Sequence, residues 1–202
     1  AESSQNISNV VSRSQTIFSG VIKGLGKQDT KILKSSKKGV EKLGEDIEDL
    51  RNNLFYFIKN LEETSLRGSK FYISILVHLT DISQSLEYIA KKGFKHVNNN
   101  HKALRFNQIK ELQEIDAALS GHLQSIITVF DHNELKEING IVTKLNELNE
   151  SISDKIDQQV ALTRAEESSP KNTALYFNIL LETKDLVTAV MLLMQQYGKN
   201  VK

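Results

Sequence analysis

Residues 75–90, ILVHLTDISQSLEYIA, decide the fold class. Their apolar side chains recur in steps of four, three, four and three, which is the spacing of one face of an α-helix. The positions on this stripe are Ile75, Leu79, Ile82, Leu86 and Ile89. The stretch therefore predicts an amphipathic helix with one buried face, although its middle carries the polar residues His78, Thr80 and Asp81.

The same spacing returns along most of the chain. It starts again at residues 33, 109 and 135, and no stretch shows sustained period-two alternation. Ser36 fills one apolar slot of the stripe that starts at residue 33. Pro170 is the only proline in 202 residues, where average usage would give about ten. We therefore predict an all-α protein.

Five breaks between the stripes predict six helices. Asp29 and Asn133 are expected N-caps, because their short side chains can accept a hydrogen bond from the first turn of a helix. Pro170 is expected at the first position of the last helix, where its missing N–H costs nothing.

The remaining breaks are expected at residues 65–69 and 96–107. The second and fifth helices, near residues 29–64 and 134–168, would then each exceed 30 residues.

The second half of the chain repeats the first. A shift of 105 residues places Glu45 and Asp49 on Glu150 and Asp154. A shift of 104 places Tyr72 on Tyr176 and Asp81 on Asp185. We predict two tandem three-helix bundles in a six-helix architecture with long antiparallel helices. The first repeat spans residues 1–98, a linker spans 99–106, and the second repeat spans 107–202.

Composition narrows the class of function. The formal net charge is only +1, so nucleic acid is not an expected partner. The chain has no cysteine, which excludes a disulfide scaffold and Cys-ligated zinc. Its longest apolar run, residues 186–194, is far shorter than the roughly 20 residues of a membrane span. Because it starts at Ala without a signal-peptide pattern, we interpret it as a soluble piece of a larger protein.

Carboxylates at matching repeat positions are the candidate functional residues. Glu45 and Asp49 share a helix face and repel each other, which a cation or a neighbouring lysine would relieve. Helical bundles build metal sites from such side chains. The candidate metal ligands are Glu45, Asp49, Asp81, Glu150, Asp154 and Asp185. The alternative is a solvated helix face, and for His78 alone we favour that interpretation.

A row of lysines runs beside the second apolar stripe. It consists of Lys31, Lys34, Lys38 and Lys42 at helical spacing. Such a row is either a solvated face or a contact with an anionic membrane surface or with phosphate. No GxSxG, HExxH or Walker motif is present, so we do not expect an enzyme.

Two three-helix repeats with acids at matching places resemble the PhoU family of phosphate-signalling proteins, over nearly the whole chain. In that family the third helix of each repeat typically carries a stretch like E-R-I-G-D. The corresponding stretches here are VHLTD at 77–81 and LETKD at 181–185, of which the final aspartates match. The pairs Glu45–Asp49 and Glu150–Asp154 are similar to the E/D-x-x-x-D carboxylates of the family. The resemblance implies a divalent or ferric metal ion as the cofactor.

Residues 75–104 resemble one branch more closely, through SLEYI followed by FKHVNNNHKAL. This branch is the cytoplasmic PhoU-like domain that follows the membrane part of bacterial sodium/phosphate cotransporters. The resemblance implies a cytoplasmic regulatory domain that modulates phosphate uptake at the inner face of the membrane.

The partner implied is the membrane domain of the transporter, with a second copy of the chain (a homodimer) and the membrane surface as further candidates. Two alternatives remain. One is a free-standing PhoU-like regulator of phosphate transport and signalling, and the other is a structural helical module that oligomerises.

Overall fold

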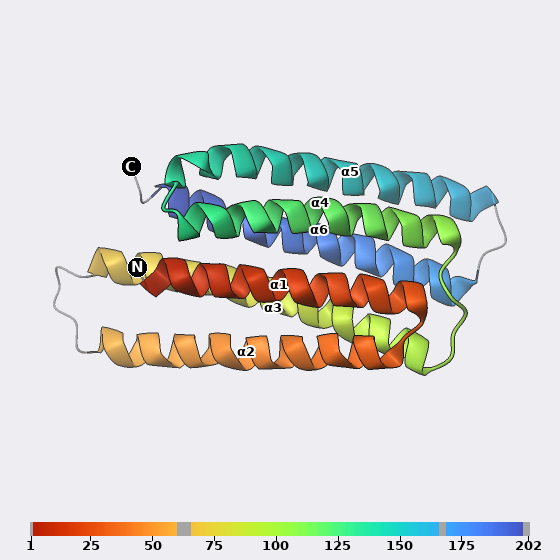
Figure 1. Ribbon diagram of the computed structural model, residues 1–202, viewed down its shortest axis with the longest axis horizontal. Helices are drawn as coiled ribbons and strands as arrows, with labels where there is room; N and C mark the ends of the chain where they lie inside the picture. The colour runs from red at the N-terminus through yellow and green to blue at the C-terminus, as the bar shows by residue number, and fades with distance from the viewer. Residues whose placement is uncertain (1, 60–65, 166–168, 200–202) are drawn as a thin grey trace.

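The structure is a computed structural model that describes residues 2–59, 66–165 and 169–199 (Figure 1). These ranges contain no β-strand, which confirms the predicted all-α class. The helices are α1 (Glu2–Lys27), α2 (Thr30–Ile58), α3 (Leu66–Asn98), α4 (Phe106–Asp131), α5 (Ile138–Ala165) and α6 (Pro170–Lys199), with a short 3-10 helix, η2 (Leu135–Glu137), before α5. None of the helices in the described ranges is long and apolar enough to cross a membrane.

The six long helices form two sets of three that lie side by side. Successive helices run in opposite directions along the long axis of the molecule (Figure 1). Helix α1 packs against α4, and α3 packs against α6, so the first and third helices of each set form the contact between the sets. The outer helices α2 and α5 lie on opposite sides of the molecule (Figure 1). The predicted architecture of two tandem three-helix bundles is confirmed.

The apolar stripes form the core, as the sequence predicts. On α3, Leu79, Ile82, Leu86 and Ile89 are all buried. Each such side chain contributes about 1.5–3 kcal/mol when it leaves water. Ser36 is also buried, and its hydroxyl lies so close to Gly20 of α1 that a Cβ there would be 2.3 Å from it. The serine in the apolar stripe is therefore part of a close approach between α1 and α2.

Two of the predicted helix starts are confirmed. Asp29 Oδ1 accepts hydrogen bonds from the backbone N–H groups of Lys31 at 2.9 Å and Ile32 at 3.2 Å, as an N-cap does. Pro170 is the first residue of α6.

Asn133 was predicted as an N-cap, and this prediction is wrong. Its φ is 55°, in the left-handed region that asparagine tolerates better than most residues. The backbone N–H of Glu134 then bonds to the carbonyl of Val129 at 2.9 Å, which closes the end of α4. Asn133 therefore ends one helix, and η2 precedes the next.

The predicted break at 65–69 is also wrong for the described residues, because α3 already begins at Leu66; residue 65 lies outside them. Helix α2 ends at Ile58 and has 29 residues, so it does not exceed 30 as predicted. Helix α5 has 28 described residues, and the residues that follow Ala165 lie outside the described ranges. The stripe of α2 continues in the sequence, but Leu50, Leu54 and Ile58 are only half-buried. Packing against the other helices thus weakens before the apolar pattern ends.

Candidate functional site

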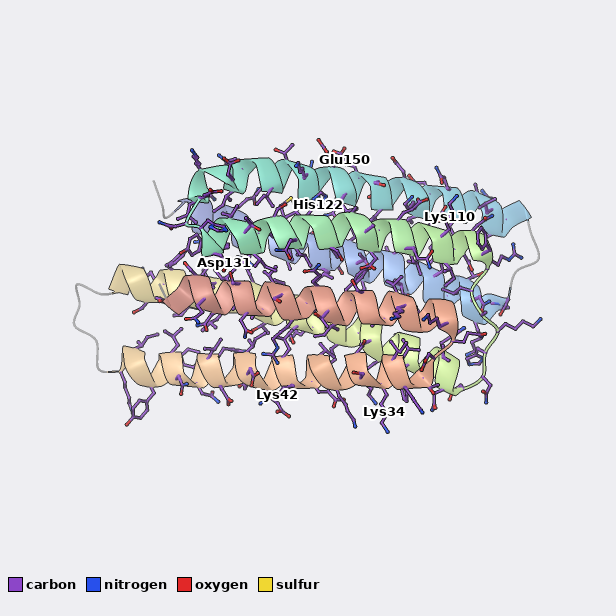
Figure 2. All side chains as sticks on the ribbon, viewed as in Figure 1. Lys34, Lys42, Lys110, His122, Asp131 and Glu150 are labelled. Atoms are coloured by element: carbon purple, nitrogen blue, oxygen red, sulfur yellow. The ribbon has the colours of Figure 1, made fainter. Side chains whose placement is uncertain are left out.

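All six candidate carboxylates lie on the surface. They are Glu45 and Asp49 on α2, Asp81 on α3, Glu150 and Asp154 on α5, and Asp185 on α6. Figure 2 shows Glu150 on the outer side of α5, where it accepts a hydrogen bond from Asn146 at 3.4 Å. Each repeat therefore presents a pair of acids on its second helix and one aspartate on its third.

These carboxylates do not converge. Across the ranges that the structure describes, no three histidine, aspartate or glutamate side chains come close enough together to hold a metal ion. As placed, at most two of these side chains could bind one ion, fewer than the roughly four protein ligands of a structural zinc site. Metal binding by these carboxylates stays a prediction.

Asp46, next to Glu45, has a structural role instead. Its carboxylate accepts a hydrogen bond from Arg13 of α1 at 2.8 Å and lies 3.0 Å from Lys42. The hydrogen bonds from Lys42 and Arg13 hold the pKa of Asp46 below its usual value. This acid ties α2 to α1, and sequence reasoning missed it because the partner lies 33 residues earlier on another helix.

An acidic groove of about 450 Å³ runs between α2 and α3. The acids that line it are Glu41, Glu45, Glu48 and Glu87. Two of them have cationic partners, since Arg51 lies 3.6 Å from Glu48 and Lys91 bonds to Glu87. The remaining two carboxylates, Glu41 and Glu45, give the groove a negative potential that favours a cationic ligand.

The groove depends on residues that only the first repeat carries. Gly44 lines it, and a Cβ there would lie 3.4 Å from the Ser83 hydroxyl. The equivalent of Gly44 in the second repeat is Asn149, whose side chain donates to Thr188 of α6 at 2.9 Å. Three of the four acids are also replaced there, by Asn146, Ser153 and Met191. The two repeats thus share a fold but differ in the surface of this face.

Buried polar groups mark the contact between α3 and α6. Burial raises the pKa of Glu182, a hydrogen bond from Ser85 of α3 opposes this shift, and the charge of Asp185 adds to it. The shift of 104 residues makes His78 the equivalent of Glu182 and makes Ala189 the equivalent of Ser85. The side chain of alanine has no hydrogen-bonding group, so it cannot replace the serine hydroxyl. The Nδ1 atom of His78 is buried without a hydrogen-bond partner.

The three polar residues in the middle of residues 75–90 therefore have three different environments. Thr80 donates to the backbone carbonyl of Leu76 at 2.8 Å and stays within its own helix. His78 is half-buried, and burial lowers its pKa while Asp81 partly opposes that shift. Asp81 faces the solvent. They form no single site among the residues that the structure describes.

Tyr176 has a partner that the sequence did not indicate. It is fully buried, and its hydroxyl donates to Glu111 of α4. Burial, this hydrogen bond and the charge of Glu111 together raise the pKa of Tyr176 far above its usual value. Its repeat equivalent, Tyr72, is 37% exposed. The matching tyrosines thus support the repeat but not a shared function.

Neither a family model nor a curated protein matches the sequence significantly. Among solved structures, the phosphate transport system regulatory protein PhoU from Streptococcus pneumoniae matches with a TM-score of 0.77 and 13% identity, over 100% of this chain and 95% of that one. PhoU from Pseudomonas aeruginosa matches with a TM-score of 0.77 and 7% identity, over 100% of this chain and 97% of the other. The chain has the PhoU fold.

This finding confirms the PhoU-like resemblance at the level of the fold. The match covers all of this chain and nearly all of each PhoU chain, so the likeness extends over the whole fold and not over one repeat alone. The narrower resemblance, to the domain of sodium/phosphate cotransporters, stays a prediction.

Proposed function

We propose that this chain is a regulatory, non-catalytic module that controls phosphate transport. The observation that carries the proposal is the PhoU fold over the full length of the chain, because one of the matching structures is described as a phosphate transport system regulatory protein. The long helices α3 and α6 run through the contact between the two repeats and could transmit a binding event as a rigid-body shift.

The finer proposal is that the chain acts as the cytosolic domain of a sodium-dependent phosphate transporter. Its support is the stretch of residues 75–104 that resembles this branch. A second point is the residues that stand at the family's acid positions, Val77 and Leu181, which are 52% and 50% exposed. An apolar side chain at both places offers no ligand to a metal, and each adds an exposed apolar surface that a protein partner can cover.

The second candidate is a free-standing PhoU-like regulator. The match to the two PhoU structures supports it equally, because an attached domain and a free-standing protein would share this fold.

Phosphate uptake tests the proposal. The segment that encodes this chain is deleted in the native host, and the initial rate of labelled phosphate uptake is compared with that of a strain in which the segment is restored. We expect the rate to change on deletion and to return on restoration. An unchanged rate at both low and high external phosphate would contradict the proposal.

The metal prediction needs a separate measurement. Elemental analysis of the protein, purified without a histidine tag, is compared with that of an Asp81→Asn/Asp185→Asn variant. The prediction is a stoichiometric metal that is lost in the variant, since carboxylates are the ligands in question. No metal in either protein, with metals offered in excess, would make these acids a solvated surface.

A further inference from the structure

One end of the molecule concentrates positive charge. It contains the turn between α1 and α2, the α3–α4 linker, the end of α5 and the start of α6 (Figure 1). The described segments 20–38, 90–113, 158–165 and 169–177 make up this basic end and carry fourteen lysines and arginines but only two acids, Asp29 and Glu111. Two further acids, Glu166 and Glu167, stand in the sequence between the last two segments and lie outside the described residues. The whole chain, by contrast, has a net charge of +1.

Both acids of the described segments already have partners. Asp29 caps α2, and Glu111 accepts the hydrogen bond of Tyr176. The lysines, in contrast, are mostly exposed, and Figure 2 shows Lys34 on α2 and Lys110 on α4 extending from the surface. The basic end therefore has a large excess of solvent-facing positive charge, which attracts anionic surfaces.

Phe106 lies within this end and is 80% exposed, although phenylalanine is normally buried. It is the first residue of α4. Arg105 precedes it, and Lys110 follows four residues later on the same side of the helix. An exposed aromatic side chain with basic residues beside it on a helix is a combination with which peripheral proteins bind a lipid interface.

The linker before Phe106 is held firmly in place. His96 Nε2 lies 2.9 Å from the carbonyl of Lys102, and Asn172 of α6 donates to the carbonyl of Ala103 at 2.8 Å. Leu104 is buried, and Gln108 accepts a hydrogen bond from the N–H of Arg105 at 2.9 Å. The exposure of Phe106 is thus a fixed feature of the structure, and little ordering would be needed on binding.

The type of basic residue favours a membrane over nucleic acid. Twelve of the fourteen are lysines, and the other two are Arg105 and Arg164. Lysine is a compact, strongly hydrated charge, whereas arginine is preferred where phosphates of nucleic acid are bound by paired hydrogen bonds. Lysines spread over a broad end fit the diffuse charge of anionic headgroups.

We propose that the basic end binds the surface of a membrane that contains anionic lipids, with the lysines at the headgroups and Phe106 inserted between them. This goes beyond the proposed function, because it requires no transporter and holds for the chain alone. In a transporter-attached protein it would also fix which end of the helices faces the membrane.

A tryptophan probe tests the insertion, because the chain has no tryptophan of its own. Phe106→Trp is mixed with vesicles of phosphatidylcholine alone or with added phosphatidylglycerol. We expect a blue shift of its fluorescence, and quenching by brominated lipid, only with the anionic vesicles. The matched control is Phe55→Trp, which replaces an exposed phenylalanine near the far end of α2 and should show neither change.

Charge variants test the electrostatic part in a vesicle sedimentation assay. Lys102→Glu/Lys110→Glu should lower the partition coefficient on anionic vesicles by at least about tenfold, because each lysine near such a surface contributes substantially to binding. Lys70→Glu/Lys136→Glu makes the same change of charge at the opposite end and should leave it nearly unchanged. Far-UV circular dichroism verifies that all variants remain helical.

Several results would overturn the proposal. These are no binding to anionic vesicles at low salt, equal losses in the two charge variants, or the same blue shift at Phe55→Trp. Millimolar inorganic phosphate that abolishes vesicle binding at constant ionic strength would assign the end to free phosphate. An equal response of Phe106→Trp to an oligonucleotide would assign it to nucleic acid.

Discussion

His78 and Glu182 occupy equivalent positions in the two repeats but differ in their hydrogen bonding. Glu182 finds Ser85 across the contact between α3 and α6, but His78 would face Ala189 at the equivalent place and keeps a buried Nδ1 without a partner. Burial lowers the pKa of His78 below its ordinary value of 6.5. The folded protein therefore binds the proton of this residue more weakly than the unfolded chain does.

This shift predicts a pH dependence of stability. Because the pKa of His78 is lower in the folded protein than the unfolded value of 6.5, its contribution to folding stability is fully present above pH 6.5. That stability is lost as the pH falls through the folded-state pKa, since the unfolded chain then binds the proton more readily. The melting temperature of the wild type should thus fall more between pH 7 and pH 5 than that of His78→Leu. His132→Leu, at an exposed histidine, is the control and should follow the wild type. Parallel pH profiles for wild type and His78→Leu would contradict this account.

The carboxylates show what single residues in a sequence can and cannot reveal. Their spacing along each helix places Glu45 and Asp49 on one face, and both are exposed as a solvated face would be. Whether acids on neighbouring helices converge depends on how each helix is rotated about its axis. The apolar stripe gives the face that each helix turns to the core, but contacts between helices, such as that of Arg13 with Asp46, decide which polar side chains come close together. No local pattern in the sequence contains this information.

At the scale of the helix, two glycines give opposite predictions. A Cβ added at Gly44 would make an ordinary contact with Ser83, so Gly44→Ala should stabilise the protein by about 0.5–1 kcal/mol through helix propensity. A Cβ at Gly24 would lie 2.5 Å from Cγ of the fully buried Leu33, so Gly24→Ala should destabilise it by about 1–3 kcal/mol. Urea denaturation measures both. If both variants gained stability, or both lost it, the spacing between these helices would differ from that described.

Helix type and number follow from the sequence, but some helix ends do not. The stripe of α3, the cap at Asp29 and the start at Pro170 are local features, and all three are confirmed. Asn133 is a residue that suits a cap at either end of a helix, and only its positive φ shows which end it closes. The end of α2 at Ile58 depends on lost tertiary packing, which spacing along one helix cannot reveal.

At the scale of the whole molecule, surfaces combine residues that are far apart in the sequence. The row beginning at Lys31 and Lys34 had two open interpretations, and the charged segment near residue 100 was predicted only as a linker. The fold brings both to one end, together with the exposed Phe106. The difference between the two repeats at the α2–α3 groove is likewise visible only in the structure, where Gly44 lies beside Ser83 but Asn149 donates to Thr188.

Sodium-dependent phosphate uptake tests the central claim most directly. Initial uptake is measured with the chain present or deleted, first with the sodium gradient intact and then with the gradient collapsed. We expect deletion to change uptake only while the gradient is intact. A change that persists without the gradient would favour a free-standing regulator of another phosphate transport system. No change under either condition would contradict the claim that this PhoU-fold chain regulates phosphate transport.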